Sequence, residues 1–145
     1  MELNDYNAKA ITDVYKNAHI ALQSLSDLIP DVDDEGIKKE LKEQYEGYES
    51  LIGEISTFMV ENGVQPKDVN PFKKAMLWGS IKMKTMMNNS RNQVAEMMIN
   101  GTTMGINELT AMKNEGNNLK KEVLNYVEKL LSLEIDYEQR LRKFL

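Results

Sequence analysis

Two polar side chains, Glu134 and Tyr137, interrupt an apolar pattern near the end of the chain. Around them apolar residues recur at alternating steps of four and three, which is the spacing of one face of a packed helix. We therefore expect a carboxylate and a phenol to point into the interior of a helical bundle. There, an ionised carboxylate must be neutralised, paired, hydrated or bound to a ligand. The predicted inward positions are Val123, Val127, Leu130, Glu134, Tyr137, Leu141 and Phe144.

Metal binding is the first chemistry that such inward residues suggest. Four-helix bundles that hold two metal ions use a Glu-x-x-His pair on each of two helices and one Glu from each of the other two. The last helix keeps the acid, Glu134, but Tyr137 stands where the histidine would be. A neutral phenol is a weak ligand, and it loses its proton only well above neutral pH. Because His19 is the one histidine of the chain, a site with two imidazoles is impossible within one subunit.

The other helices offer few further ligands. On the second helix, Gln44 and Tyr48 take the inward positions, although a shift in register would bring Glu43 and Glu46 inward instead. On the third long helix, Glu108 lies at the edge of the inward face. We expect no metal, and the candidate ligands for a bound ion are Glu134, Tyr137, Gln44, Tyr48, Glu43, Glu46, Glu108 and His19.

A metal-free polar cluster explains the same residues. A buried carboxyl group that is hydrogen-bonded to a phenol or an amide is satisfied without a metal. The partners predicted for Glu134 are Tyr137, Gln44, Tyr48 and Thr102. His19 follows the inward residue Ala18, and a lone histidine at the margin of a core is predicted to be a hydrogen-bonded structural residue.

Helix-stopping residues divide the chain into five predicted helices within a single domain of residues 1–145. Pro30 ends the first helix because proline lacks the amide proton that a continuing helix needs, and Gly63 ends the second. The short turn after Pro30 makes the second helix return antiparallel beside the first. The predicted ranges are 5–29, 34–62, 71–87, 91–115 and a last helix that follows Gly116-Asn117-Asn118 and runs to the C-terminus.

A short crossover helix is predicted between the second and third long helices. Asn70 and Pro71 have the cap-then-proline order of a helix start, and the helix that they begin contains Trp78. Ser90 and Gln93 have the spacing of a capping box at the start of the next long helix. The sequence thus predicts an all-α, antiparallel four-helix bundle with one extra crossover helix.

The inward faces of the other long helices follow from the same helical spacing. In the first helix they are Ile11, Val14, Ala18, Ala21, Leu25 and Leu28. In the second helix they are Ile37, Leu41, Gln44, Tyr48, Leu51, Ile55 and Phe58. In the third long helix they are Met98, Thr102, Gly105, Leu109 and Met112, and the small residues Gly101 and Gly105 let a neighbouring helix approach closely.

Composition restricts the class of partner. The 145 residues carry a formal net charge of −5, so a nucleic-acid backbone is not the expected partner. The absence of cysteine excludes disulfides and thiol chemistry. The N-terminus has no basic start followed by an apolar run, and no stretch approaches about 18 uninterrupted apolar residues. We therefore predict a cytoplasmic protein that does not enter a membrane.

Methionine is concentrated in one part of the chain. Eight of the ten methionines lie between positions 76 and 112, namely Met76, Met83, Met86, Met87, Met97, Met98, Met104 and Met112. Thioethers can bind Cu(I), but flexible side chains that fill an irregular core or a dimer surface are the favoured interpretation. An adaptable face for a protein partner is a third interpretation of this Met-rich region.

The order of these features resembles the bacterial ferritin-like, rubrerythrin-like bundle families, and it is closest to one of their branches of unknown function. The resemblance covers essentially the whole chain: a helical hairpin, the glycine turn after it, the Trp78 crossover helix, the helix with Gly101 and Gly105, and Glu134 with Tyr137 in the last helix. For an enzyme of these families, the resemblance implies oxygen-dependent oxidation of iron at a pair of metal ions. The ligand set departs from their pattern because both histidines are missing.

Two hypotheses about function follow. In the first, the bundle has lost its dimetal centre and is a non-catalytic structural or protein-interaction module, as a homodimer with the Met-rich region as the surface for a further partner. In the second, it is an iron- or manganese-binding oxidoreductase or storage protein with an atypical site of Glu, Tyr and Gln. Metal analysis discriminates between the two hypotheses.

Overall fold

The computed structural model of the chain describes residues 3–67 and 90–145. Every regular element in these two ranges is a helix, as the sequence predicts. The long helices are α1 (Asp5–Leu28), α2 (Glu35–Glu61), α4 (Arg91–Asn114) and α5 (Lys121–Arg142). Short 3-10 turns, Ile29–Asp31 and Gly116–Asn118, follow α1 and α4. The predicted crossover helix over 71–87, with Trp78 and the Asn70-Pro71 start, lies outside the described residues.

Local capping chemistry explains where the helices begin and end. The side chain of Asp34 accepts a hydrogen bond from the backbone N–H of Ile37 at 2.9 Å, so α2 begins with a satisfied cap. Gly63 ends α2 with a φ of 77°, a left-handed conformation that glycine adopts without a Cβ clash. The predicted capping box at Ser90 is wrong, because the Ser90 hydroxyl donates to Asn92 Oδ1 at 3.0 Å and caps no backbone N–H of α4.

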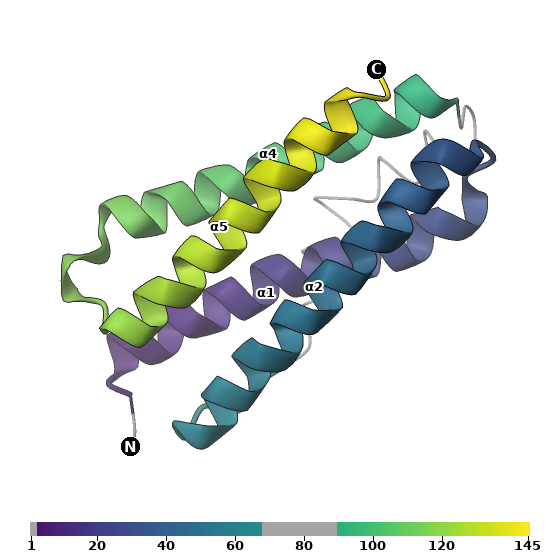
Figure 1. Cartoon of the computed structure of the whole chain (residues 1–145). Coiled ribbons are helices and arrows are strands. Elements are labelled where there is room, and N and C mark those ends of the chain that lie inside the picture. Colours follow the sequence, from purple (N-terminus) through teal and green to yellow (C-terminus); the bar gives the residue numbers. More distant parts are fainter. Residues whose placement is uncertain (1–2, 68–89) are drawn as a thin grey trace.

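The four long helices form two pairs that run in opposite directions. In Figure 1, α1 and α5 run one way along the molecule, and α2 and α4 run the other way. The closest pairings are α1 with α2 and α4 with α5, and α1 and α5 also pack against each other. The end of α2 and the start of α4 lie at opposite ends of the molecule, as Figure 1 shows. The chain therefore leaves α2 at one end of the molecule and enters α4 at the other.

The predicted inward faces form one continuous core. On α1 and α5 the predicted residues are buried, except that Phe144 is only partly buried. On α2 the last inward residue is Met59, which is fully buried, and not Phe58, which packs at the margin of the core. Helical spacing therefore predicted the faces correctly, and the error at the end of α2 is one position along the helix.

Gly47 shows how closely α2 and α5 approach. A Cβ built at this position would collide with the hydroxyl oxygen of Tyr137 on α5. Gly53, on the same helix, has no atom within 4 Å of the position that its Cβ would take. Only the first of these two glycines is therefore required by packing.

We predict opposite effects for alanine at these two glycines. Gly47→Ala should lower the free energy of unfolding by about 1–3 kcal/mol, because the Tyr137 ring has to move in a packed interface. Gly53→Ala should raise it by about 0.5–1 kcal/mol, because alanine is the better helix former where there is space. Urea denaturation of both variants measures the difference, and equal stabilities would show that α2 and α5 do not meet at Gly47.

The buried polar residue Asn7 joins the start of α1 to the start of α5. Asn4 caps α1 by accepting a hydrogen bond from the backbone N–H of Asn7 at 2.8 Å. The Asn7 side-chain oxygen accepts in turn from the backbone N–H of Lys120 at 2.8 Å, just before α5 begins. These bonds hold the start of α1 against the start of α5.

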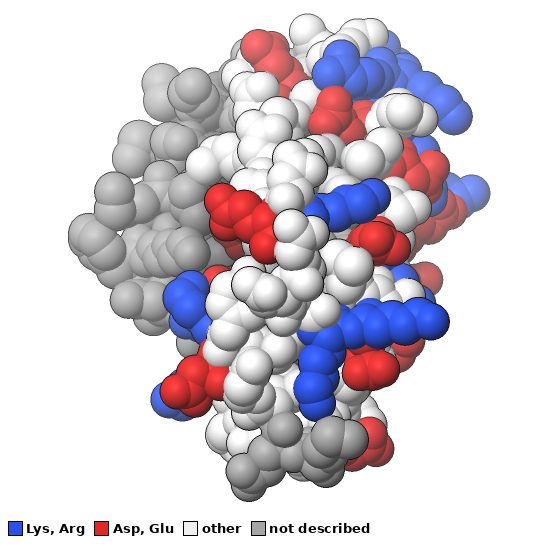
Figure 2. All heavy atoms as spheres, turned by 90° about the vertical axis from the view of Figure 1, so that its left-hand side faces the viewer, with Lys and Arg blue, Asp and Glu red and all other residues white. Residues whose placement is uncertain are grey.

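Basic and acidic side chains are mixed on the exposed faces of the helices. Figure 2 shows basic and acidic side chains interspersed over one face of the molecule, with no large area of a single sign. Ion pairs one helical turn apart join Lys9 to Asp13 at 2.8 Å and Arg142 to Glu138 at 2.9 Å. Among the described helices, none has a stretch long and apolar enough to cross a membrane.

The Met-rich region is partly described. Met97 and Met98 are buried in the core with 4% and 2% of their surface exposed, which confirms a packing role for these two. Met112 packs partly buried against the same core, whereas Met104 is 49% exposed. The methionines at positions 76, 83, 86 and 87 lie outside the described residues.

Candidate functional site

Glu134 is the buried carboxyl group at the centre of the candidate site. It lies on α5 with 2% of its surface exposed, as the apolar pattern predicts. The hydroxyl of Tyr48, on α2, donates a hydrogen bond to Glu134 Oε2 at 3.2 Å. Tyr48 is itself buried with 2% of its surface exposed. Two helices far apart in the sequence thus bring a carboxyl group and a phenol into contact.

Burial raises the pKa values of both groups, which favours their neutral forms. Burial raises the pKa of Glu134 well above its ordinary 4.5; the hydrogen bond from Tyr48 opposes this shift, and the negative charge of Glu108 adds to it. Burial raises the pKa of Tyr48 well above 10.0, and the nearby Glu134 raises it further. The low dielectric of the interior disfavours each charged form. The site is therefore built for a carboxyl group that holds its proton at higher pH than usual.

Two buried oxygen atoms in this site have no hydrogen-bond partner within residues 3–67 and 90–145: Glu134 Oε1 and Asn17 Oδ1. The side-chain nitrogen of Asn17 donates a hydrogen bond to the backbone carbonyl of Gly105 at 3.2 Å. This bond fixes the orientation of the Asn17 amide group, and with it the position of Oδ1. A Cβ at Gly105 would lie 2.6 Å from Glu134 Oε1 and 3.2 Å from Asn17 Oδ1. The absence of a side chain at Gly105 therefore makes room beside α4 for both oxygen atoms.

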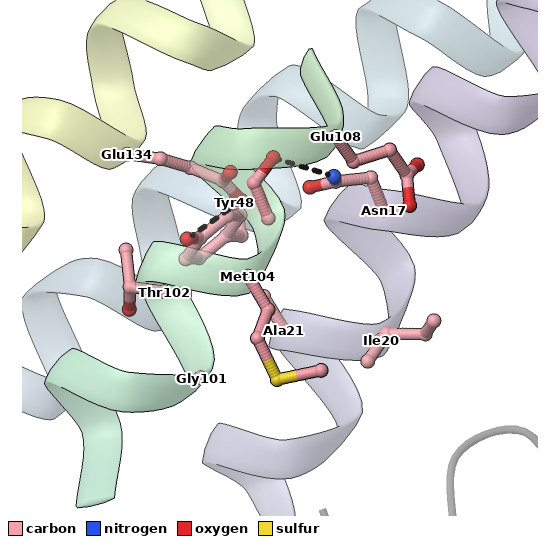
Figure 3. Close-up of a pocket in the computed structure, with 10 residues that line it drawn as sticks. Asn17, Ile20, Ala21, Tyr48, Gly101, Thr102, Met104, Glu108 and Glu134 are labelled. Carbon is pink, nitrogen blue, oxygen red and sulfur yellow. Dashed lines mark hydrogen bonds between the residues drawn. The ribbon is translucent and has the colours of Figure 1, made fainter. Parts of the chain in front are cut away.

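A small cavity of about 150 Å³ lies beside these atoms. Figure 3 shows the side chains of Glu134, Tyr48 and Asn17 meeting beside α4, with the two hydrogen bonds drawn as dashed lines. The exposed Glu108 and the half-exposed Met104 place the outer edge of the cavity at the molecular surface. Its lining residues are Asn17, Ile20, Ala21, Tyr48, Gly101, Thr102, Met104, Gly105, Glu108 and Glu134.

Three of the partners predicted for Glu134 form no hydrogen bond with it in the described residues. The Gln44 side chain donates to Glu40 at 3.0 Å and to the backbone carbonyl of Tyr137 at 3.4 Å. The Tyr137 hydroxyl lies against Gly47, and its ring meets the Tyr48 ring edge-on with centroids 5.4 Å apart. The Thr102 hydroxyl donates to the backbone carbonyl of Met98 at 2.7 Å. Of the four predicted partners, Tyr48 alone bonds to the acid within the described part of the chain.

The register shift that would bring Glu43 and Glu46 inward is wrong, because both side chains are exposed while Gln44 and Tyr48 are buried. Glu43 instead forms an ion pair with Arg140 at 2.7 Å. The guanidinium of Arg140 also reaches Glu40 at 3.0 Å. These contacts join α2 to α5 at the surface, away from the Glu134 carboxyl group.

His19 does not reach this site, and the hydrogen bond predicted for it is not found in the described residues. Its ring stacks on Tyr15, with centroids 5.4 Å apart. Its buried Nδ1 has no hydrogen-bond partner in the described residues. The contact shown for His19 is thus the packing of its ring against Tyr15. Residues 3–67 and 90–145 also contain no group of three or more His, Cys, Asp or Glu side chains arranged to hold a metal ion.

Asn17 is the site residue that sequence reasoning missed. It comes three residues after the buried Val14 and four before the buried Ala21, so helical spacing puts it on a face that packs against another helix. This polar interruption of an apolar face is the same signal that identified Glu134. Gly105 was predicted as a packing glycine, and that role is confirmed by its contacts with Glu134 and Asn17.

Comparison with known proteins adds no family to this description. No family model matches the chain, and no curated protein or solved structure matches it. The chemistry of the Glu134 site is therefore the basis on which a function has to be argued.

Proposed function

We propose that this protein is a non-catalytic helical bundle of ferritin-like ancestry in which a metal-free polar site has replaced the dimetal centre. The observation that carries the proposal is the hydrogen bond from Tyr48 to the buried carboxyl group of Glu134, at 3.2 Å. A neutral acid that accepts a hydrogen bond from a phenol carries no charge, so no cation is needed to balance it in the interior. The role that remains for such a bundle is structural or one of interaction with another molecule.

The directions of the helices support the ferritin-like ancestry. Bundles of that class have one long connection that runs from one end to the other, between their second and third helices. Here α2 ends and α4 begins at opposite ends of the molecule (Figure 1). The chain between them, residues 62–90, is long enough to include the crossover helix that we propose over 71–87.

The chemistry of the donor atoms supports the loss of the metals. A dimetal centre needs four carboxylates and two imidazoles that converge in the core. On α1, the residues that line the cavity are Asn17, Ile20 and Ala21, and none of them has a carboxylate or an imidazole. The acid that α4 brings closest is Glu108, which is exposed. One buried carboxyl group does not neutralise two divalent cations.

An iron- or manganese-binding protein is the alternative. It is favoured by the two unpaired oxygens, Glu134 Oε1 and Asn17 Oδ1, because both metals accept oxygen ligands and buried polar atoms normally have partners. Glu108 would supply the second carboxylate at the edge of the cavity. The Glu, Tyr and Gln shell expected from the sequence would be replaced by Glu134, Asn17 and Glu108.

Elemental analysis of protein purified without chelator separates these two proposals. We expect much less than one equivalent of iron or manganese per chain, and no change in Glu134→Ala relative to the control Glu46→Ala, whose acid is exposed. Stoichiometric iron or manganese that is lost in Glu134→Ala and retained in Glu46→Ala would overturn the metal-free proposal and establish the alternative.

A further inference from the structure

The cavity beside Glu134 has the features of a binding site and not of a packing defect. An apolar void is lined by carbon atoms, whereas two of the residues that line this cavity, Glu134 and Asn17, each have a buried oxygen, Oε1 and Oδ1, without a partner in the described residues. Leaving a buried polar atom unpaired is unfavourable, so native proteins usually satisfy it. Gly105 leaves room for both atoms, because a Cβ there would lie 2.6 Å from Glu134 Oε1 and 3.2 Å from Asn17 Oδ1.

The unpaired atoms determine what chemistry the guest must have. Asn17 Oδ1 is an amide oxygen and can only accept hydrogen bonds, and the bond from the amide nitrogen to the Gly105 carbonyl fixes which end of the amide is the oxygen. Glu134 Oε1 is an acceptor when the acid is ionised, and Tyr48 donates to its other oxygen. Glu108 adds a second negative charge at the edge. A guest that fits these atoms donates several hydrogen bonds and carries a positive charge, as an ammonium group does with its three N–H donors.

We propose that the cavity binds the primary ammonium group of a small alkylamine, with Glu134 Oε1 and Asn17 Oδ1 accepting its hydrogen bonds. The inference rests on the proposal that Glu134 holds no metal. Ile20, Ala21 and Met104 line the cavity and provide apolar contacts for the alkyl chain, and Figure 3 shows Met104 on the same side as Ala21. A cavity of 150 Å³ accommodates a guest about the size of benzene, which limits the chain to about four to six carbon atoms.

Binding changes the protonation of Glu134. The guest enters as an ammonium ion, and the carboxyl group that it meets has to give up its proton to form the ion pair. The carboxylic acid and the ammonium ion become a carboxylate paired with the ammonium ion, and one proton passes to the solvent. The positive charge of the guest lowers the pKa of Glu134, in the opposite direction to burial.

The test is a titration of the full-length protein with butylamine, followed by NMR with isotopically labelled glutamate. We expect saturable shifts with a Kd on the order of 1 mM, because so small a guest makes few contacts. The carboxyl signal of Glu134 should move to its ionised position on binding. In Glu134→Gln and in Asn17→Ala, affinity should fall by about tenfold or more, as the loss of a hydrogen bond to a charged group implies.

Controls isolate each part of the inference. Butanol has the same chain without the charge and should bind at least about tenfold more weakly. Glu46→Gln, at an exposed acid, should bind as the wild type does. A capped lysine tests whether the amine comes from a protein side chain: tighter binding than butylamine assigns the site to a partner's lysine, and weaker binding assigns it to a free amine.

The outcomes separate this inference from the proposed function. Equal binding of butanol and butylamine, unchanged affinity in a folded Glu134→Gln variant, or no shift at all in metal-free protein would each overturn the ammonium site and leave the metal-free bundle intact. Stoichiometric metal at Glu134 would overturn the proposed function first. Circular dichroism of the variants establishes that they are folded.

Discussion

Leu130→Ala should lower the free energy of unfolding by about 2–5 kcal/mol, the largest stability effect that we expect from a single substitution in α5. Leu130 is fully buried, four residues before Glu134, so it shares the inward face that positions the acid. Removing its side chain leaves a cavity in a core that all four long helices line. Urea denaturation, fitted with a common slope for the wild type and the variant, measures the loss.

Ile135→Ala is the matched control for this prediction. Ile135 lies on the same helix with 41% of its surface exposed, and we expect its truncation to change stability by about 0.5 kcal/mol or less. Because an error in the orientation of α5 would exchange buried and exposed positions, the pair of variants tests which face of the helix is inward. A larger loss in Ile135→Ala than in Leu130→Ala would contradict the packing and remove Glu134 from the core.

Glu134→Gln should make the protein more stable than the wild type, by an amount that grows as the pH rises. Burial raises the pKa of Glu134 in the folded protein above its ordinary 4.5 in the unfolded chain. The folded state therefore keeps the proton longer, and stability that is present below the unfolded pKa is lost as pH rises through the folded pKa. Glutamine keeps an acceptor for the Tyr48 hydroxyl without titrating, so it avoids this loss.

The difference between the wild type and Glu134→Gln should grow by at most about 1.4 kcal/mol per pH unit, the limit for one proton. Its total should reach about 1–3 kcal/mol, similar to the penalty for an unsatisfied buried group. Denaturation from about pH 5 to about pH 8 measures it, with exposed Glu46→Gln as a control that should follow the wild type. A constant difference across this range would mean that Glu134 is ionised throughout.

The groups that face Glu134 make this pH dependence interpretable. Tyr48 on α2 donates a hydrogen bond that favours ionisation of Glu134, and Glu108 on α4 opposes it through its charge. From α1 the neutral side chain of Asn17 lines the same cavity. Since the pKa of Tyr48 is raised well above 10.0, the phenol stays neutral across the measured range, and the carboxyl group of Glu134 is the group whose titration the comparison follows.

The orientation of each helix could be predicted from the sequence because it depends on local spacing. Apolar residues at steps of three and four determine which side of a helix is buried, whichever helix covers it. Glu134 and Tyr48 were found in this way, as polar residues on apolar faces, and both are buried. The helix ends at Pro30 and Gly63 were predictable for the same reason, since proline and glycine act on their own backbone.

The contacts between helices could not be predicted in the same way. Which phenol reaches Glu134 depends on how far α2 and α5 are displaced along each other, and heptad spacing does not determine that displacement. Tyr137 was an equally good candidate by spacing, but its hydroxyl lies against Gly47 and Tyr48 bonds to the acid. Asn17 is held in the site by its hydrogen bond to Gly105 on α4. This contact forms only when α1 and α4 pack together, so the sequence of α1 alone does not predict it.

The buried acid is a local exception to an otherwise consistent sequence. The spacing of apolar residues, the helix caps and the turns all favour the packed helices. The buried carboxyl group of Glu134, with one unpaired oxygen, instead lowers the stability of the fold. Such exceptions are typical of functional positions, because a purely structural core gains from replacing them with apolar residues. This is the physical reason for proposing that Glu134 serves binding and not stability.

The most direct measurement of the metal-free site is anomalous X-ray scattering from crystals of protein purified without chelator, collected at the iron and manganese absorption edges. We expect no anomalous peak beside Glu134 Oε1, and refined density there that fits water or an organic guest. A strong peak bonded to Glu134, above all a pair of peaks that share its carboxylate, would contradict it.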